Sequence, residues 1–376
     1  MFYLLGWKLG IRVSEETKDR YILAALSEIP GFGSRRIRRL LEAFPAAELW
    51  RIPAEEMREA EPSAVLRERL AAFRMEHPDE PERLWERCGK AGAEVCTIQS
   101  AEYPTALREI FDPPIVLYYR GIWIPDARRV AMVGSRRCSS YGEGIAQNFA
   151  RDFAAAGLTV VSGAARGIDT NAHKGALRGG RTAAVLGCGI DIAYPRENRR
   201  MLEEIAERGV VLSEYGPGVQ PLPAFFPARN RIISGLSEGT LVVEAARRSG
   251  SLITAELALS EGRNVYAVPG SIWSESSAGC HHLIQQGAKL VTAPQDVLED
   301  YGIEAAPARK KRLSLSPEER KIWQVLSFDH YLTPDEIVLS LPDGDIANLP
   351  LQLLQMELKG LVIQNDLHAY RRAERE

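Results

Sequence analysis

Nine short apolar runs lie between residues 94 and 291, and helical patterns separate them. Most are near-continuous aliphatic stretches bounded by glycine or proline, which is typical of strands covered on both faces. Strands that alternate with helices form a mostly parallel sheet with helices on either side. The sequence therefore predicts an α/β fold, an extended Rossmann-like doubly wound domain, over residues 93–303. The expected strands are Glu94–Thr97, Val116–Tyr119, Val130–Val133, Thr159–Val161, Thr182–Leu186, Val210–Leu212, Gly239–Val243, Asn264–Val268 and Lys289–Val291.

The region before this domain, residues 14–92, has a helical pattern. Ser14 is the expected N-cap of the first helix, and apolar residues recur after it at helical spacing. Further on, the Gly31–Ser34 turn and the four arginines that follow it resemble a helix-hairpin-helix element, whose turn amides approach a DNA phosphate. A plain helical hairpin with a solvated basic face explains the same residues equally well.

The region after it begins with a linker, residues 304–313, which is small and Pro-containing at first and then basic. Residues 314–373 are expected to form three helices and then a β-hairpin, which is the order of a winged helix. Lys359 is the only positive residue of the third helix, so we favour a protein-interaction or stabilising role over DNA reading. The expected elements are helices at Pro317–Leu326, Asp335–Leu341 and Ile346–Lys359, and strands at Leu361–Gln364 and around Tyr370, joined by the turn Asn365–Asp366.

Composition narrows the possible functions. The net charge is only -3, so any anion site must be a local basic patch. Five cysteines without a C-x-x-C pair argue against a disulfide framework and a zinc ribbon, and no metal or cofactor is expected. The apolar opening, residues 1–13, is too short to cross a bilayer and has no export cleavage site. We therefore expect a cytoplasmic protein with no membrane partner.

Three strand-to-helix junctions carry the chemistry: Val130–Arg137, Val160–His173 and Phe226–Thr254. Each offers glycine amides, small hydroxyls and an arginine. Parallel strands end at one edge of a sheet, where α/β proteins bind phosphorylated ligands and helix N-termini favour anions. A phosphate-binding surface is therefore expected there. The Gly-Ser-Arg-Arg turn is no dinucleotide fingerprint, and no acid follows the next strand to hold a ribose, which argues against NAD.

Several polar residues near these junctions are expected to be structural. Asp169 is the expected cap of the helix that carries His173, and His173 is expected to be a hydrogen-bonding residue instead of a base. Cys188 has no evident histidine partner, so we expect no nucleophile there. Glu244 is expected to bond the Gly250–Ser251 turn or an arginine.

Strings from most of the chain resemble one family, the DNA processing protein A family, also called DprA or Smf. Together these strings are far more specific than any single glycine pattern. They are YPTALREIFDPPIVLYYRG (103–121), VGSRRCSSYG (133–142), VVSGAARGIDTNAHKGAL (160–177), LGCGIDIAYPRENR (186–199), LSEYGPG (212–218), FPARNRIISGLS (226–237), VVEAARRSGSLITAELALSEGRNVYAVPGS (242–271) and GCHHLIQQGAKLV (279–291).

The resemblance implies a protein that binds single-stranded DNA without sequence specificity, protects it and loads the RecA recombinase onto it during natural transformation, with no reaction of its own. It also implies a sterile-α-motif-like domain first, a winged helix last, a homodimer through the Rossmann domain, and single-strand-binding protein as a further partner. The family's basic DNA pocket maps to Arg136, Ser162, Gly163, Arg166, Asn230 and Arg231, with Arg196, Arg199 and Arg229 as extensions and Ser135, Gly167, Gly250 and Ser251 from the same turns.

Two other interpretations are open. Hydrolases that cleave nucleoside monophosphates use similar glycine-rich loops and a Gly-Thr turn ahead of a glutamate, as in Gly239-Thr240 and Glu244, although these lie at opposite ends of a strand here. A protein scaffold would leave the arginines solvated or paired with acids. Aromatic residues would stack on bases if exposed, although core packing is expected for most. The candidates are Tyr194, Phe225, Phe226 and Trp273.

Overall fold

The computed structural model describes residues 14–304, 315–328, 330–341, 348–365 and 367–373. These residues divide into two compact units, one within residues 1–138 and 145–303 and the other within residues 139–144 and 304–376. Four predicted features lie wholly or partly outside the described residues. They are the opening 1–13, the linker 304–313, the start of the third C-terminal helix at Ile346 and the turn Asn365–Asp366.

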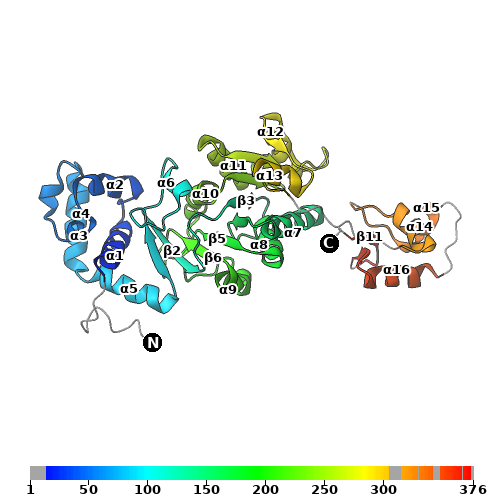
Figure 1. The fold of residues 1–376 in the computed structure, drawn as a ribbon, viewed down its shortest axis with the longest axis horizontal. Helices are drawn as coiled ribbons and strands as arrows, with labels where there is room; N and C mark the ends of the chain where they lie inside the picture. Colours follow the sequence, from blue (N-terminus) through cyan, green and yellow to red (C-terminus); the bar gives the residue numbers. More distant parts are fainter. Residues whose placement is uncertain (1–13, 305–314, 329, 342–347, 366, 374–376) are drawn as a thin grey trace. The chain divides into compact units, whose positions relative to one another are not determined.

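A nine-stranded sheet forms the centre of the first unit (Figure 1). All nine predicted strands are present, with ends within two residues of the expected bounds. Strand β2 pairs antiparallel with both of its neighbours, and every other pair is parallel, so the parallel strands end at one edge. Across the sheet the order is β1 (Glu94–Thr97), β2 (Val116–Gly121), β6 (Val210–Ser213), β5 (Thr182–Leu186), β4 (Thr159–Ser162), β3 (Arg129–Val133), β7 (Gly239–Val242), β8 (Asn264–Ala267) and β9 (Lys289–Leu290).

Helices cover both faces of this sheet. They are α6 (Thr105–Arg108), α7 (Ser140–Ala155), α8 (Ile168–Gly179), α9 (Arg199–Arg208), α10 (Phe225–Gly235), α11 (Gly250–Ser260), α12 (Ala278–Gln285) and α13 (Pro294–Asp300). Successive side chains of a strand point to opposite faces. In β5, Ala184 and Leu186 share a buried cluster with α8 and α9, whereas Ala183 and Val185 share another with α10 and α11. The α/β fold with helices on both faces is therefore confirmed.

Five helices precede the sheet and share its core. They are α1 (Glu15–Ser27), α2 (Ser34–Ala43), α3 (Ala46–Leu49), α4 (Ala64–Glu76) and α5 (Glu80–Ala91). As predicted, Ser14 caps α1, and its hydroxyl accepts a bond from the Thr17 amide at 3.2 Å. Leu26 of α1 lies in the same buried cluster as Val95 and Tyr118, and Figure 1 shows α1 next to β2. The expected boundary near residue 92 therefore separates two layers of one compact unit, not two independent bodies.

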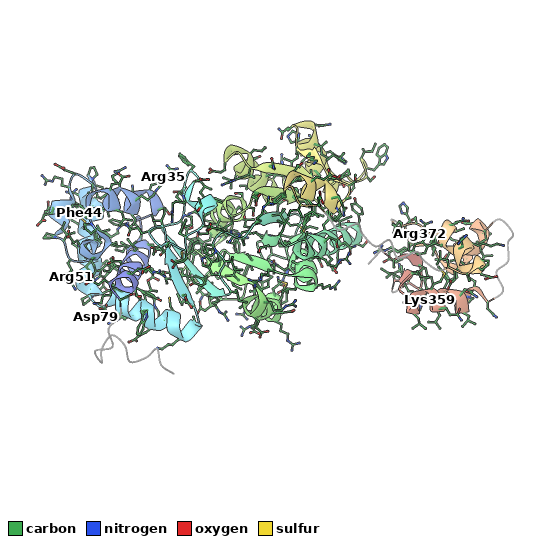
Figure 2. All side chains as sticks on the ribbon, viewed as in Figure 1. Arg35, Phe44, Arg51, Asp79, Lys359 and Arg372 are labelled. Carbon is green, nitrogen blue, oxygen red and sulfur yellow. The ribbon has the colours of Figure 1, made fainter. Side chains whose placement is uncertain are left out.

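The Gly31–Ser34 turn and the helix that follows it contact the sheet domain. The Arg35 guanidinium lies 4.5 Å from the centre of the Phe111 ring, and Figure 2 shows Arg35 on the side of α2 nearest α6. Arg38 donates to the Phe111 carbonyl at 3.4 Å, and the Ser34 hydroxyl donates to Glu214 at 3.4 Å. These contacts join two layers of one unit. They favour the plain helical hairpin over a DNA-binding element.

The second unit contains α14 (Pro317–Val325), α15 (Pro334–Ser340), α16 (Leu349–Leu358), β10 (Val362–Gln364) and β11 (Tyr370–Arg372). Strands β10 and β11 form an antiparallel hairpin, and Leu332 adds a bridge to Tyr370. This is the predicted order of three helices and a hairpin. The assignment to the winged-helix class stays a prediction.

Two basic side chains of the second unit, Lys359 and Arg372, which Figure 2 labels, have partners within the unit. Lys359, which follows α16, donates to Glu319 at 2.6 Å. The Arg372 guanidinium lies 5.1 Å from the centre of the Trp323 ring and donates to the Trp323 carbonyl at 2.7 Å. This pairing supports an interaction or stabilising role over DNA reading. None of the helices in the described ranges has both the length and the apolar character needed to span a bilayer.

Candidate nucleic-acid interface

A cleft of about 710 Å³ opens at the edge where the parallel strands end. The turn after β3, the loop after β4, the segment after β7 and the start of α10 line it, so all three predicted junctions meet there. We call it the central cleft. The predicted phosphate-binding residues that line it are Ser135, Arg136, Arg229, Asn230, Gly250 and Ser251, and the predicted stacking residues that line it are Tyr194 and Phe226. Arg137, Arg248 and Ser249 also line it and were not predicted.

A second cavity, of about 360 Å³, adjoins the central cleft, and we call it the side pocket. Arg136 and Phe226 line both cavities. Gly163, Arg166 and Arg196 line the side pocket as well. The structure therefore brings together arginines from three separate sequence motifs.

Four exposed arginines in these cavities have no acidic partner among the described residues. Arg136, Arg137 and Arg248 line the central cleft, and Arg196 lines the side pocket. Within the described part of the chain, none of the four forms an ion pair. Asp169 is the one acidic residue in the lining of the central cleft, and it is buried. The central cleft therefore carries a local positive charge in a chain whose net charge is negative.

Helix α11 begins in the wall of the central cleft. Ser249 is its N-cap, and its hydroxyl accepts from the Ser251 amide at 3.4 Å and bonds the Ser251 hydroxyl at 2.7 Å. Gly250 is exposed and presents its backbone without a side chain. The first amides of a helix lack partners inside the helix and carry a partial positive charge. This helix end therefore adds a backbone anion site to the arginines.

The turn after β3 and the loop after β4 are held against each other. The Ser135 hydroxyl donates to the Arg137 carbonyl at 2.9 Å and accepts from the Arg137 amide at 3.1 Å. The Ser135 carbonyl accepts from the Ile168 amide at 3.1 Å. Gly167, at the N-cap of α8, has φ 74° and ψ -125°, and a Cβ there would lie 2.2 Å from the Ser135 carbonyl oxygen. Glycine is therefore required where these two loops meet.

Arg229 lies in the lining of the central cleft but is held by structural bonds, which argues against its predicted role as an extension of the phosphate surface. Its side chain is buried, with 4% of the residue exposed. Its Nη1 donates to the Gly163 carbonyl at 2.7 Å and to the Val185 carbonyl, which ties the ends of β4 and β5 together. Burial lowers the pKa of Arg229 and raises the pKa of Asp169, and the attraction between these two groups opposes both shifts.

Besides Gly167, which lines neither cavity, three other predicted residues lie outside the central cleft and the side pocket. The Ser162 hydroxyl is fully buried and donates to the Met132 carbonyl at 2.7 Å. Arg231 pairs with Glu214 at 2.6 Å and with Asp112 at 3.4 Å, and only 14% of its side chain is exposed. Arg199 is exposed but lines a separate cavity of about 70 Å³, which Asp191 also lines. None of these three lines the central cleft or the side pocket, which argues against their predicted roles.

Asp169 and His173 have the structural roles expected of them, although the position of Asp169 differs from the prediction. Asp169 does not cap α8, because Gly167 holds the N-cap and Asp169 lies in the first turn, where it accepts from the Ala165 amide at 3.3 Å. The buried His173 ring bonds the Thr182 hydroxyl at 2.7 Å through Nδ1, and burial lowers its pKa to about 3. A neutral, bonded imidazole fits the predicted structural role.

The side chains that a cysteine nucleophile or the alternative nucleoside-monophosphate hydrolase would use are buried. Burial raises the pKa of the Cys188 thiol to about 11, which disfavours the reactive thiolate. Thr240 lies inside β7, whereas Glu244 lies beyond its end and accepts a bond from the Ser276 hydroxyl at 2.5 Å. Both side chains are buried. Among the described residues, no group of three histidine, cysteine, aspartate or glutamate side chains could hold a metal ion.

One aromatic pair lies at the boundary of the two cavities. The rings of Tyr194 and Phe226 are 5.3 Å apart, and the Arg136 guanidinium lies 5.6 Å from the centre of the Phe226 ring. Tyr194 is 44% exposed, so its ring is available for stacking. Phe225 instead stacks on Tyr215 at 4.1 Å. Trp273 is 89% exposed but lines neither cavity.

The predicted set lacked Arg137, Arg248 and Ser249, although the sequence contains a signal for each. Arg137 directly follows Arg136 in the turn after β3. Arg248 and Ser249 stand immediately before the Gly250–Ser251 pair, where a basic residue followed by a serine N-cap marks an anion-binding helix start.

The fold and the two cavities define a class of protein: a Rossmann-like α/β protein with an arginine-rich anion site at the end of its parallel strands. Residues 94–302 match the family of DNA recombination-mediator protein A. The chain is 53% identical over 205 residues to DNA processing protein DprA of Streptococcus pneumoniae, over 53% of this chain and 71% of that protein. It is 41% identical over 272 residues to Protein Smf of Escherichia coli, over 69% of this chain and 72% of that protein. The chain belongs to the DNA recombination-mediator protein A family.

Solved structures agree with this assignment. DNA processing protein A from Streptococcus pneumoniae matches with a TM-score of 0.66 and 40% identity, over 77% of this chain and 98% of that one. DNA processing protein A from Helicobacter pylori, whose structure concerns its single-stranded DNA binding mode, matches with a TM-score of 0.51 and 30% identity. That match covers 56% of this chain and 97% of that one.

Proposed function

We propose that this protein binds single-stranded DNA without reading its sequence, protects the strand and delivers it to the RecA recombinase during natural transformation. The observation that carries the proposal is the central cleft, where Arg136, Arg137 and Arg248 form no ion pair with any described residue and lie beside the start of α11. Phosphates bind guanidinium groups and helix-start amides whatever the bases are. The relative from Helicobacter pylori supports single-stranded DNA as the ligand.

The aromatic pair explains why one strand is preferred over a duplex. An exposed Tyr194 ring can stack only on a base that is free of its partner strand. Base stacking contributes about 1–3 kcal/mol per base and tolerates all four bases. Binding is therefore expected to be strong, dependent on salt and nearly independent of sequence.

The remaining parts of the proposal concern place and partners. The family description as a recombination mediator supports RecA as the partner that receives the strand. We also propose action in the cytoplasm, a homodimer through the Rossmann domain, and single-strand-binding protein as the protein that is displaced. These parts rest on the family and are independent of the geometry of the cleft.

The test is fluorescence anisotropy with labelled single-stranded and duplex oligonucleotides at several salt concentrations. Wild type is expected to prefer the single strand, with a salt slope of about 3.5 for roughly five phosphate contacts. The variant Arg136→Glu with Arg166→Glu is expected to bind about 100-fold more weakly or not at all, because two attractive charges become repulsive. The matched control reverses two exposed charges on α5, Arg83→Glu with Lys90→Glu, and is expected to bind as wild type does.

Wild-type affinity in the Arg136 and Arg166 variant would exclude the two cavities as the DNA site and favour the protein scaffold for them. The RecA step needs a separate measurement, the rate of RecA filament growth on DNA coated with single-strand-binding protein. Wild type is expected to shorten the lag, and the same variant is not. Release of free base from a nucleoside monophosphate would instead support the hydrolase, which the burial of Thr240 and Glu244 argues against.

A further inference from the structure

A third cavity, of about 950 Å³, lies between α8 and α9 and continues the path of the first two. We call it the α8–α9 groove. Arg166 and Glu197 line both this groove and the side pocket, just as Arg136 lines both the side pocket and the central cleft. The three cavities therefore form one connected surface. The central cleft and the side pocket are the candidate DNA site, and the α8–α9 groove extends the surface beyond them.

Two rows of side chains face each other across the α8–α9 groove. Lys174 and Arg178 are four residues apart on α8, and Arg200 and Arg208 are eight residues apart on α9, so each pair lies on one helix face. Both helices follow parallel strands, and α8 starts at the edge of the central cleft, which Asp169 of its first turn lines. The groove therefore begins at the DNA site and runs along the helices away from it.

The charge of the groove is strongly positive. Lys174, Arg178 and Arg200 are exposed, and across the described ranges none of them forms an ion pair. The two acidic residues of the groove are already occupied, because Glu197 pairs with Arg166 and Glu204 pairs with Arg208. Three cations thus stay uncompensated in a chain with a net charge of -3. A solvated helix face would account for the charge alone, but not for a cavity continuous with the DNA site.

We propose that the α8–α9 groove binds the continuation of the same DNA strand, with its phosphates on Lys174, Arg178 and Arg200. This inference rests on the proposed function. The helix rise places Arg178 about 15 Å beyond the start of α8, which is enough for on the order of three phosphates. No aromatic residue lines the groove, so the bases are not stacked there. The groove adds affinity that depends on salt and on strand length.

The experiment compares a short and a long oligonucleotide, dT6 and dT20, on wild type and on the triple variant Lys174→Ala, Arg178→Ala and Arg200→Ala. The short strand fills the central cleft and side pocket, so the variant is expected to bind dT6 within twofold of wild type. The long strand also reaches the groove. Its affinity is expected to fall about 20-fold at 100 mM salt, and its salt slope to fall by about 2, for three lost phosphate contacts.

The matched control removes three exposed cations elsewhere, Arg51→Ala, Arg83→Ala and Lys90→Ala, and is expected to bind both strands as wild type does. Unchanged dT20 binding by the groove variant overturns the inference and leaves the proposed function standing. Equal weakening on dT6 and dT20 also overturns it, because the three cations would then serve the short-strand site. If wild type binds neither strand, the proposed function itself fails. Thermal melting of each variant verifies that it is folded.

Discussion

Replacing Gly167 by alanine is expected to lower the free energy of unfolding by about 4 kcal/mol and to abolish tight binding of single-stranded DNA. Two effects add up. The backbone of Gly167, with φ 74° and ψ -125°, lies in a region that side chains disfavour. The new Cβ would also lie 2.2 Å from the Ser135 carbonyl oxygen and 2.8 Å from the Arg136 carbonyl oxygen. Relief of that contact must separate the two arginine-bearing loops.

Gly157→Ala is the matched control for this prediction. Gly157 also has a positive φ, of 91°, but no heavy atom lies within 4 Å of its expected Cβ. It therefore measures backbone strain without the clash, and its expected cost is about 1 kcal/mol with DNA binding unchanged. Urea unfolding and anisotropy on both variants give the comparison. If both variants lost the same unfolding free energy and the same DNA affinity, the close approach of the turn after β3 to the loop after β4 would be unimportant.

Arg229→Met is expected to lower the free energy of unfolding by about 4 kcal/mol while the folded protein still binds DNA. The substitution keeps most of the side-chain volume but removes the donors to the Gly163 and Val185 carbonyls. It also leaves the buried Asp169 carboxylate without its nearby positive charge. Buried groups that lose their partners are costly because water cannot replace the bonds.

Arg196→Met gives the opposite expected result, since Arg196 is exposed in the side pocket and has no ion pair with any described residue. Its stability should stay within about 0.5 kcal/mol of wild type, and its DNA affinity should fall several-fold. Urea unfolding and anisotropy, measured on both variants, separate the two roles. If Arg229→Met were as stable as wild type but bound DNA poorly, Arg229 would be a ligand residue after all.

The sequence predicted the strands and the turns well because both depend on local residue patterns. Aliphatic runs bounded by glycine or proline marked all nine strands. Strand direction is different, because the antiparallel pairing of β2 depends on how distant segments meet. The boundary near residue 92 has the same explanation. A change from helical to strand pattern is local, whereas the shared core of α1 with β1 and β2 is a tertiary property.

Side-chain roles within one motif could not be predicted from the sequence. Arg229, Asn230 and Arg231 are consecutive on α10, so their side chains leave the helix about 100° apart. Asn230 faces the central cleft, Arg229 points into the protein, and Arg231 meets Glu214 and Asp112. Those partners are distant in sequence. A basic string therefore marks the region of the site but leaves open which of its residues contact a ligand.

The ion pair between Arg166 and Glu197 gives this protein a built-in competitor for its own ligand. Both side chains are exposed, and they lie where the side pocket meets the α8–α9 groove. A phosphate that arrives there must displace a carboxylate before it gains the guanidinium, and the carboxylate returns when the phosphate leaves. The strand is thus held less tightly at this point than at an unpaired arginine. Under the proposed delivery of the strand to a recombinase, this position would be the point of easiest release.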